Sequence, residues 1–232
     1  MKISEIIEKN KKSIVLLEIL IPKDNNQATR SVRGTGFVIS ADGKFITNNH
    51  VYQQVADNER QHLRVMVPGK TDEKGIVYYD GYRLELLKKD EENDLALMKI
   101  IAPPEMTFSP VNVGKPEGET IKEGEEVLFL GYPLATELMI LGFGITLAAN
   151  HCVVSAIKRK AVDGSLHFFM VDTHINNGSS GSPVFSVETG KIVGVASGRI
   201  SAKVPLAENQ TADIPANMGI CRSSKYITNL TN

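Results

Sequence analysis

The sequence predicts an all-β protein that forms either a sandwich or barrels. Short runs rich in β-branched and aromatic residues alternate with turn residues along most of the chain. Asp-Gly pairs at 42–43, 80–81 and 163–164 lie between such runs, and this pair is the strongest short signal for a β-hairpin. Helical periodicity is confined to three short segments, so strands must supply the core.

The predicted strands follow one another at short intervals, as sandwiches and barrels require. In chain order they are GTGFVIS at 34–40, KFIT at 44–47, LRVMVP at 63–68, GIVYY at 75–79, YRLELL at 82–87, DLALMKI at 94–100, EEVLFLGY at 125–132, HCVVSAI at 151–157 and LHFFMV at 166–171. A further hairpin joins PVFSV at 183–187 to GKIV at 190–193. Residues 103–123 contain prolines and glycines and few strand formers, so we interpret them as the connector between two β halves.

Helices are expected only near the chain ends and in one turn. The first covers residues 3–12, where Ile3 and Ile7 share one face. A short helical turn is expected over 51–55, after a histidine. The last helix covers 223–232, where a serine can cap its first turn.

The composition excludes several classes of protein. With 232 residues, of which 42% are hydrophobic and 23% charged, the chain can bury a substantial core. A net charge of −1 argues against a nucleic-acid partner. The longest nearly apolar run, 138–149, is too short to span a bilayer, and charged residues interrupt any signal-peptide core within 1–20. We therefore expect a cytoplasmic protein without membrane insertion.

The cysteines and most histidines show no metal-binding pattern. Cys152 and Cys221 lie far apart without a CxxC motif. In a protein without an export signal, buried thiols are favoured over a disulfide, which stays the alternative. The histidines other than His50 have no ligand spacing with one another or with a cysteine. We therefore expect neither a metal nor another cofactor.

The stretch INNGSSGSPVF at 175–185 places small residues before a buried strand, where close backbone approach explains them. A serine nucleophile needs a histidine base and a carboxylate that orients the base. All five histidines precede this stretch, which excludes the Ser–Asp–His order, and GSSGS is not the GxSxG motif of α/β-hydrolases. The subtilisin order would leave only Asp24 or Asp42, both in loop-like contexts, before His50. The order that fits is His–Asp–Ser.

Three sequence blocks occur in that order. KFITNNHV leads to His50, NDLALMKI contains Asp94, and INNGSSGSP contains Ser180. With GKIVGVASG and NMGICRSS, these blocks make the chain, from about residue 30 onward, resemble the HtrA-like trypsin-like serine peptidases. The resemblance implies an all-β, chymotrypsin-like fold: two antiparallel six-stranded β-barrels with short N- and C-terminal helices.

The resemblance also implies one peptidase domain over residues 1–232. We expect the first barrel at about 13–102, the connector at about 103–123, the second barrel at about 124–222 and the C-terminal helix at about 223–232. The PDZ domain that many such peptidases append is expected to be absent. We expect a homo-oligomer or a recruiting partner to take its role.

By the same resemblance, the site residues have distinct roles. Ser180 is the nucleophile, His50 the general base and Asp94 the residue that orients the base. The backbone amides of Gly178 and Ser180 form the oxyanion hole, and Gly is expected at 178 because its turn leaves no room for a side chain. Ser182 stands where the usual pattern has a glycine.

The substrate pocket is placed by its distance from the nucleophile. The residue six before Ser180 lies at the pocket floor in the family, and residues of two later strands form its walls. The substrate-binding residues expected in this way are His174, Ala196, Ser197, Gly198 and Cys221. Since this set has no carboxylate to pair a Lys or Arg side chain, we expect cleavage after small or medium aliphatic residues. Arg199 and His174 keep open the alternative that an acidic residue is recognised.

The predicted function is therefore a serine endopeptidase that hydrolyses peptide bonds of polypeptide substrates through an acyl-enzyme. The alternative is a catalytically inactive two-barrel module that binds a peptide strand without cutting it.

Overall fold

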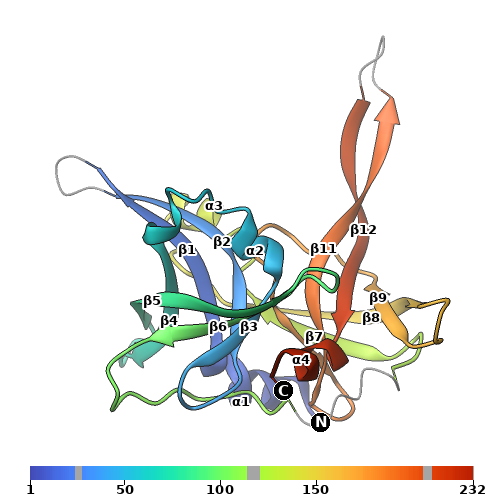
Figure 1. Cartoon of the computed structure of the whole chain (residues 1–232), viewed down its shortest axis with the longest axis horizontal. Helices are drawn as coiled ribbons and strands as arrows, with labels where there is room; N and C mark the ends of the chain where they lie inside the picture. The colour runs from blue at the N-terminus through green and yellow to red at the C-terminus, as the bar shows by residue number, and fades with distance from the viewer. Residues whose placement is uncertain (24–27, 114–120, 206–210, 232) are drawn as a thin grey trace.

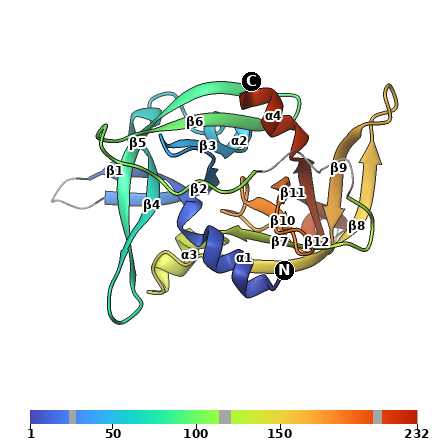
Figure 2. The same ribbon diagram turned by 90° about the horizontal axis from the view of Figure 1, so that it is seen from below.

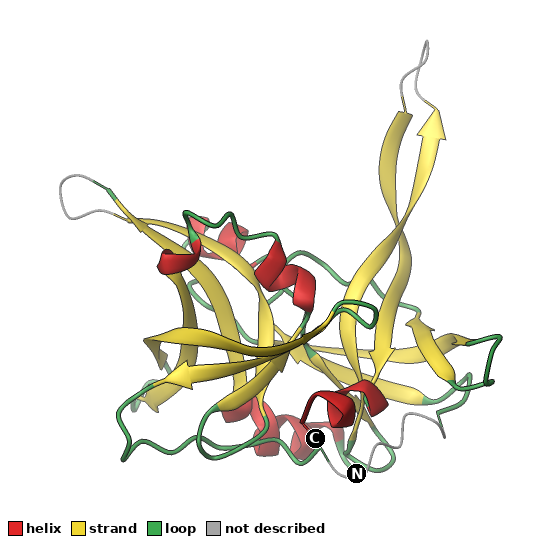
Figure 3. Ribbon diagram, in the orientation of Figure 1, coloured by secondary structure: helices red, strands yellow, loops and turns green. Residues whose placement is uncertain are grey.

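Two closed β-barrels make up most of the chain (Figure 1). The computed structural model describes residues 1–23, 28–113, 121–205 and 211–231. The first barrel has the strand order β1-β2-β3-β6-β5-β4 and the second β10-β11-β12-β9-β8-β7, and neighbouring strands in both are antiparallel. The all-β, two-barrel fold expected from the sequence is confirmed (Figure 3).

The first barrel follows the predicted strands with two exceptions: its first strand was not expected from the sequence, and the hairpin predicted at 80–81 does not form. Its strands are β1 (Ile14–Pro22), β2 (Ala28–Val38), β3 (Lys44–Thr47), β4 (Leu63–Thr71), β5 (Val77–Asp90) and β6 (Leu95–Ile101). The predicted hairpin turn at 42–43 is confirmed, with Gly43 at φ +88° between β2 and β3. The hairpin predicted at 80–81 is wrong, because that pair lies inside β5. The turn occurs at 72–75 instead, where the Asp72 carboxylate accepts the amides of Lys74 and Ile76.

The second barrel is closed by a pair of long strands. Its strands are β7 (Glu126–Gly131), β8 (Ala148–Arg159), β9 (Leu166–Val171), β10 (Pro183–Ser186), β11 (Ile192–Pro205) and β12 (Thr211–Ser223). The predicted turn at 163–164 lies between β8 and β9 and is confirmed. β11 and β12 continue beyond the barrel as a two-stranded arm, drawn in orange and red in Figure 1. The described part of the predicted connector holds no strand, and residues 114–120 of it lie outside the described residues.

Short helices cover the ends and edges of the barrels. They are α1 (Ile3–Asn10), η1 (Lys11–Ser13), α2 (Asn49–Gln53), η3 (Arg60–His62), α3 (Ala135–Ile140) and α4 (Lys225–Thr231). Helices occur at the three predicted places, although α2 begins two residues earlier than expected and includes His50. Neither η3 nor α3 was expected from the sequence. In the part of the chain that the structure describes, no helix has the length and apolar character needed to cross a bilayer. Figure 2 shows α1 beside the second barrel and α4 against the first.

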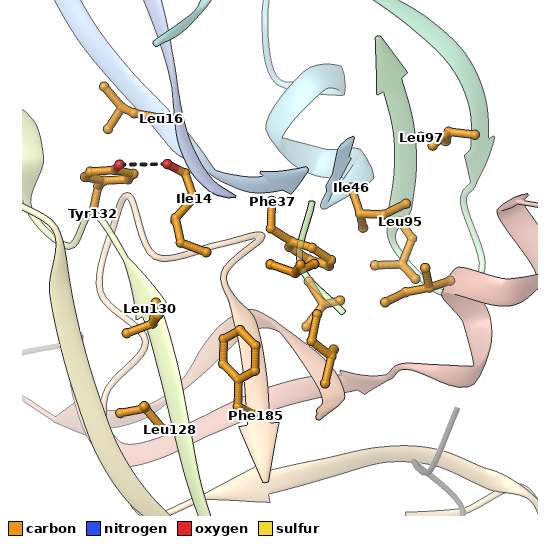
Figure 4. Packing of buried hydrophobic residues seen from close by; sticks show 14 of the residues in the cluster. Ile14, Leu16, Phe37, Ile46, Leu95, Leu97, Leu128, Leu130, Tyr132 and Phe185 are labelled. Carbon is orange, nitrogen blue, oxygen red and sulfur yellow. Dashed lines mark hydrogen bonds between the residues drawn. The ribbon is translucent and has the colours of Figure 1, made fainter. Parts of the chain in front are cut away.

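The two barrels share one apolar core (Figure 4). β1, β2, β3 and β6 contribute residues from the first barrel, β7 and β10 contribute residues from the second, and α4 adds the side chains of its inner face. The labelled members are Ile14, Leu16, Phe37, Ile46, Leu95, Leu97, Leu128, Leu130, Tyr132 and Phe185. Fully buried Tyr132, which follows β7, donates its hydroxyl proton to the carbonyl of Ile14 in β1 at 2.9 Å. This buried bond fixes the second barrel against the first.

Both cysteines are free and buried in a second apolar cluster, inside the second barrel. The prediction of buried thiols rather than a disulfide is confirmed. Burial raises the pKa of the Cys152 thiol to about 12 and the pKa of the Cys221 thiol well above its ordinary value. Both thiols are therefore protonated and unreactive at neutral pH.

Tyr132→Phe tests the bond between the barrels. Removing the hydroxyl should lower the free energy of unfolding by about 1 kcal/mol, because the buried carbonyl of Ile14 loses a donor. Urea denaturation measures the change. Tyr52→Phe, at a half-buried position in α2 that packs against the first barrel, is the control. Equal unfolding midpoints for wild type and Tyr132→Phe would show that the bond contributes nothing.

Candidate active site

His50 and Asp94 form a tight pair at the end of the first barrel. His50 lies in α2, directly after β3, and Asp94 directly precedes β6. The His50 Nδ1 atom is 2.8 Å from Asp94 Oδ2, and the His50 backbone amide donates to Asp94 Oδ1 at 2.9 Å. One carboxylate therefore holds both the ring and the backbone of the same residue, which fixes the orientation of the imidazole.

The loop before β6 is built to present Asp94. β3 pairs with β6 through Thr47 and Ala96, so their ends lie side by side. Asp94 itself has a left-handed backbone, with φ +54°. Because this conformation is costly for a residue with a Cβ, it must be stabilised by its surroundings. The Asp94 carbonyl accepts the Asn48 side-chain amide at 2.9 Å and the Asn49 backbone amide at 3.1 Å.

Ser197, in β11 of the second barrel, donates its hydroxyl proton to Asp94 Oδ2 at 2.6 Å. Burial by itself would raise the pKa of the Asp94 carboxyl. The hydrogen bonds from His50 and Ser197, together with the charge of His50, outweigh burial and hold this pKa below its ordinary value of 3.8. Sequence reasoning placed Ser197 in the pocket wall and missed this contact, because the two residues are 103 positions apart in different barrels.

Ser180 lies on the turn before β10 and belongs to the same cluster. Its hydroxyl donates to the Ser197 carbonyl at 3.2 Å. Ser197 thus contacts Asp94 through its side chain and Ser180 through its backbone. Ser180 and His50 line one cleft between the barrels. The structure therefore brings together the three residues that the His–Asp–Ser order selected.

The peptide groups before Ser180 have defined orientations. The Asn177 carbonyl accepts the Leu134 amide at 2.7 Å, and the Gly178 carbonyl accepts the Thr35 hydroxyl at 2.7 Å. In a trans peptide the N–H points opposite to the C=O of the same plane. The Gly178 amide therefore points away from Leu134, and Gly178 lines the cleft.

Thr35 holds this turn from the first barrel and was not predicted as a site residue. Its backbone amide donates to the Ser180 carbonyl at 2.8 Å, and its hydroxyl oxygen accepts the Tyr132 amide at 3.1 Å. Its own carbonyl accepts the Thr47 hydroxyl at 2.7 Å. Thr35 is completely buried. The motif GTG around it was visible in the sequence, but its contacts with residues 132–180 were not.

Glycine is required at two positions of the serine-rich stretch. Gly178 and Gly181 both have φ +90°. A Cβ at 178 would lie 2.2 Å from the Tyr132 carbonyl oxygen, and a Cβ at 181 would lie 2.0 Å from the Thr35 carbonyl oxygen. Ser182, in place of the usual glycine, fits because its hydroxyl lies over Gly131, where a Cβ would come within 2.0 Å.

The cleft has a volume of about 390 Å³. Its lining comprises Val32, Arg33, His50, Gln54, Ile175, Asn176, Asn177, Gly178, Ser180, Ser197, Gly198 and Arg199. Of the predicted substrate-binding residues, Ser197 and Gly198 line it, whereas Ala196 and Cys221 are fully buried behind it. His174 is not among the lining residues. The adjacent Ile175 lines the cleft instead.

Among the described residues, no three His, Cys, Asp or Glu side chains gather in a group that could hold a metal ion.

Comparison with known families agrees with this geometry. The family model described as "Trypsin-like peptidase domain" matches residues 34–195, which include His50, Asp94 and Ser180. The chain belongs to the trypsin-like peptidases. The matched segment begins in β2 and ends in β11, so it contains most strands of both barrels.

Curated relatives of the peptidase domain are themselves named as proteases. A probable periplasmic serine endoprotease DegP-like from Marinomonas sp. is 34% identical over 172 residues, which is 74% of this chain and 30% of the relative. Its counterpart from Hahella chejuensis is 33% identical over 165 residues, which is 71% of the chain and 29% of the relative. The magnetosome formation protease MamE of Magnetospirillum gryphiswaldense is 32% identical over 181 residues, which is 75% of this chain and 20% of the relative. The peptidase domain thus matches less than a third of each relative.

The expected cytoplasmic location is wrong, because relatives of the peptidase domain are named as periplasmic endoproteases. The expectation depended on the charged, interrupted pattern of residues 1–20. These residues form α1 and most of β1, and their apolar side chains pack into the barrel core. The pattern of charged and apolar residues at 1–20 is therefore explained by folding, and it does not indicate the compartment of the protein.

Ser197→Ala should raise the pKa of Asp94 towards 3.8, because the carboxylate loses a hydrogen bond that favours its charged form. In the wild type, the lowered pKa stabilises the folded state above pH 3.8, and this contribution is lost as the pH falls through the folded pKa. Carboxyl ¹³C NMR titration measures the shift. Ser201→Ala, at an exposed position of β11, is the control. An unchanged Asp94 titration in Ser197→Ala would contradict the assignment.

Proposed function

We propose that this trypsin-like peptidase domain is an active serine endopeptidase. The observation that supports the proposal most directly is the cluster of His50, Asp94 and Ser180 around Ser197, formed from both barrels. The family match and the protease names of the relatives support the same reaction class. The substrates are polypeptides, which lie in the cleft between the barrels. The homo-oligomer or recruiting partner expected from the sequence stays a prediction.

In the proposed reaction, Ser180 Oγ attacks the carbonyl carbon of the scissile peptide bond. The free Nε2 atom of His50 takes the hydroxyl proton as the new bond forms. For this transfer, the Ser180 side chain turns from the Ser197 carbonyl towards the imidazole of His50, which lines the same cleft. Asp94 keeps the Nδ1 proton in place and stabilises the imidazolium that results.

The oxyanion of the tetrahedral intermediate is stabilised by the amides of Gly178 and Ser180. The bonds from Leu134 and Thr35 to this turn orient it before substrate binds, so no reorganisation is required during the reaction. His50 then gives its proton to the leaving amine, and the C–N bond breaks to leave an acyl-enzyme on Ser180. A water molecule, deprotonated by His50, releases the acid product and restores the serine.

A peptide-binding module without catalysis is the second candidate. The observation that favours it is the direction of the Ser180 hydroxyl, which donates to the Ser197 carbonyl. In such a module, a peptide strand would lie in the same cleft without being cut.

The pocket for the residue before the scissile bond is proposed to accept small or medium aliphatic side chains. Ile175, Ser197 and Gly198 are among the apolar or small residues of the cleft lining. A Lys or Arg side chain would find no carboxylate among the lining residues. A preference for Lys or Arg before the cut would contradict this assignment.

Ser180→Ala separates the two candidates. The wild type should react with a fluorophosphonate probe and hydrolyse denatured protein, whereas the variant should lose labelling and several orders of magnitude of rate. Intact-protein mass spectrometry and a gel assay measure these effects. Ser179→Ala is the matched control, because the buried Ser179 hydroxyl has no hydrogen-bond partner among the described residues. A folded wild type that neither labels nor cleaves would favour the binding module.

Gly178→Ala tests the proposed oxyanion hole. The new Cβ would collide with the Tyr132 carbonyl and displace the Gly178 amide, so labelling and hydrolysis should slow by about a hundredfold or more. Gly142→Ala is the matched control, since Gly142 has a similar φ of +85° but open space around it. If both variants lose the same activity, backbone strain rather than the collision is responsible.

A further inference from the structure

The cleft beside Ser180 carries positive charge on both walls. Arg33, in β2, lines it from the first barrel, and Arg199, in β11, lines it from the second. The other lining residues are polar amides, small residues, two aliphatic side chains and His50. No Asp or Glu occurs among the described residues of this lining. The balance of charge in the cleft therefore favours an anionic ligand.

Arg199 is the more available of the two cations. It lies two residues after Ser197, whose backbone carbonyl accepts a hydrogen bond from the Ser180 hydroxyl. The backbone of Arg199 is therefore close to the nucleophile. Its side chain is exposed, and no ion pair joins it to a carboxylate within the described ranges. A guanidinium in this position can bind a carboxylate with two parallel hydrogen bonds.

Arg33 is only weakly engaged. Its guanidinium lies 3.7 Å from the Glu59 carboxylate, and about a third of each side chain is exposed, at 32% and 33%. Ion pairs of this length and exposure are weak. The Arg33 Nε atom is buried and has no hydrogen-bond partner in the described structure. Two residues after Arg33, the backbone amide of Thr35 donates to the Ser180 carbonyl. Arg33 therefore lines the same cleft from the opposite wall.

The nearby acidic groups do not cancel these charges. Asp94 is held by His50 and Ser197, on the far side of the imidazole. Glu137 lines a separate, adjoining pocket of about 220 Å³, together with Asn177 and Gly178. An acidic substrate side chain would therefore be repelled at that pocket and attracted towards the two arginines.

We propose that this peptidase selects segments with acidic side chains close to the scissile bond, and that Arg33 and Arg199 recognise them at different substrate positions. The inference rests on the proposed endopeptidase function and extends it from the reaction to the class of substrate. The residue before the cut stays aliphatic, and the acidic side chains lie at neighbouring positions. Because the two arginines come from different walls, their contributions should be nearly additive.

Peptide pairs that differ only by Glu or Gln test the proposal. Each peptide carries Val before the cut, and one Glu or Gln is moved through the three positions on either side of the bond. For the wild type at low salt, kcat/KM should be about threefold or more higher for Glu than for Gln at two positions at least. The ratio should fall when the ionic strength is raised, because both arginines are partly exposed to solvent.

Charge substitutions assign the two positions. Arg199→Gln should bring the Glu/Gln ratio to about one at one position, and Arg33→Gln should do so at another. Arg199→Glu should reverse the preference and favour a Lys peptide at its position. Lys203→Gln, farther along β11 and outside the cleft lining, is the matched control and should leave every ratio unchanged.

The outcomes separate this inference from the proposed function. Cleavage of Glu and Gln peptides at equal rates by an active wild type would overturn the inference alone. Ratios that persist unchanged in Arg199→Gln and Arg33→Gln would overturn it as well. If the wild type cleaves no peptide and does not react with the fluorophosphonate probe, the endopeptidase function fails, and this inference fails with it.

Discussion

Thr35, in β2 of the first barrel, uses both of its backbone polar groups and its hydroxyl to hold parts of the active-site region. Its amide binds Ser180, its hydroxyl binds Gly178 and Tyr132, and its carbonyl accepts a bond from Thr47. Since Thr35 is completely buried, any of these groups left without a partner would carry the full cost of desolvation. The serine turn of the second barrel is therefore tied to the first barrel through Thr35, in addition to its own bonds with Ala196 of β11.

The chemistry of the site depends on the relative position of the two barrels. His50 and Asp94 come from one barrel and Ser180 from the other, so a small sliding movement would separate the base from the nucleophile. Ser197 adds a second tie, because its hydroxyl binds Asp94 while its carbonyl binds Ser180. The shared apolar core provides the stiffness, and these few buried polar contacts provide the alignment.

Features that depend on neighbouring residues could be predicted from the sequence, and features that depend on distant ones could not. The turns at 42–43 and 163–164 form as their Asp-Gly pairs indicate. The order of the three sequence blocks selected His50, Asp94 and Ser180, which lie in one cluster with Ser197. The hairpin predicted at 80–81 was wrong because the turn forms earlier in the chain, where the Asp72 carboxylate stabilises it. The roles of Thr35 and Ser197 arise only from contacts between barrels, and no local pattern records such contacts.

The position of α4 has a consequence for the order in which the domain can be completed during its synthesis. Tyr226, Ile227 and Leu230 belong to the same apolar cluster as Leu95 and Leu97 of β6, so the end of the second barrel packs against the first. A nascent chain that has emerged only as far as β6 leaves this face of the first barrel in contact with water. It is covered only once residues 226–230 have left the ribosome. Until then, the strand that follows Asp94 lacks the apolar cover that α4 provides in the finished domain.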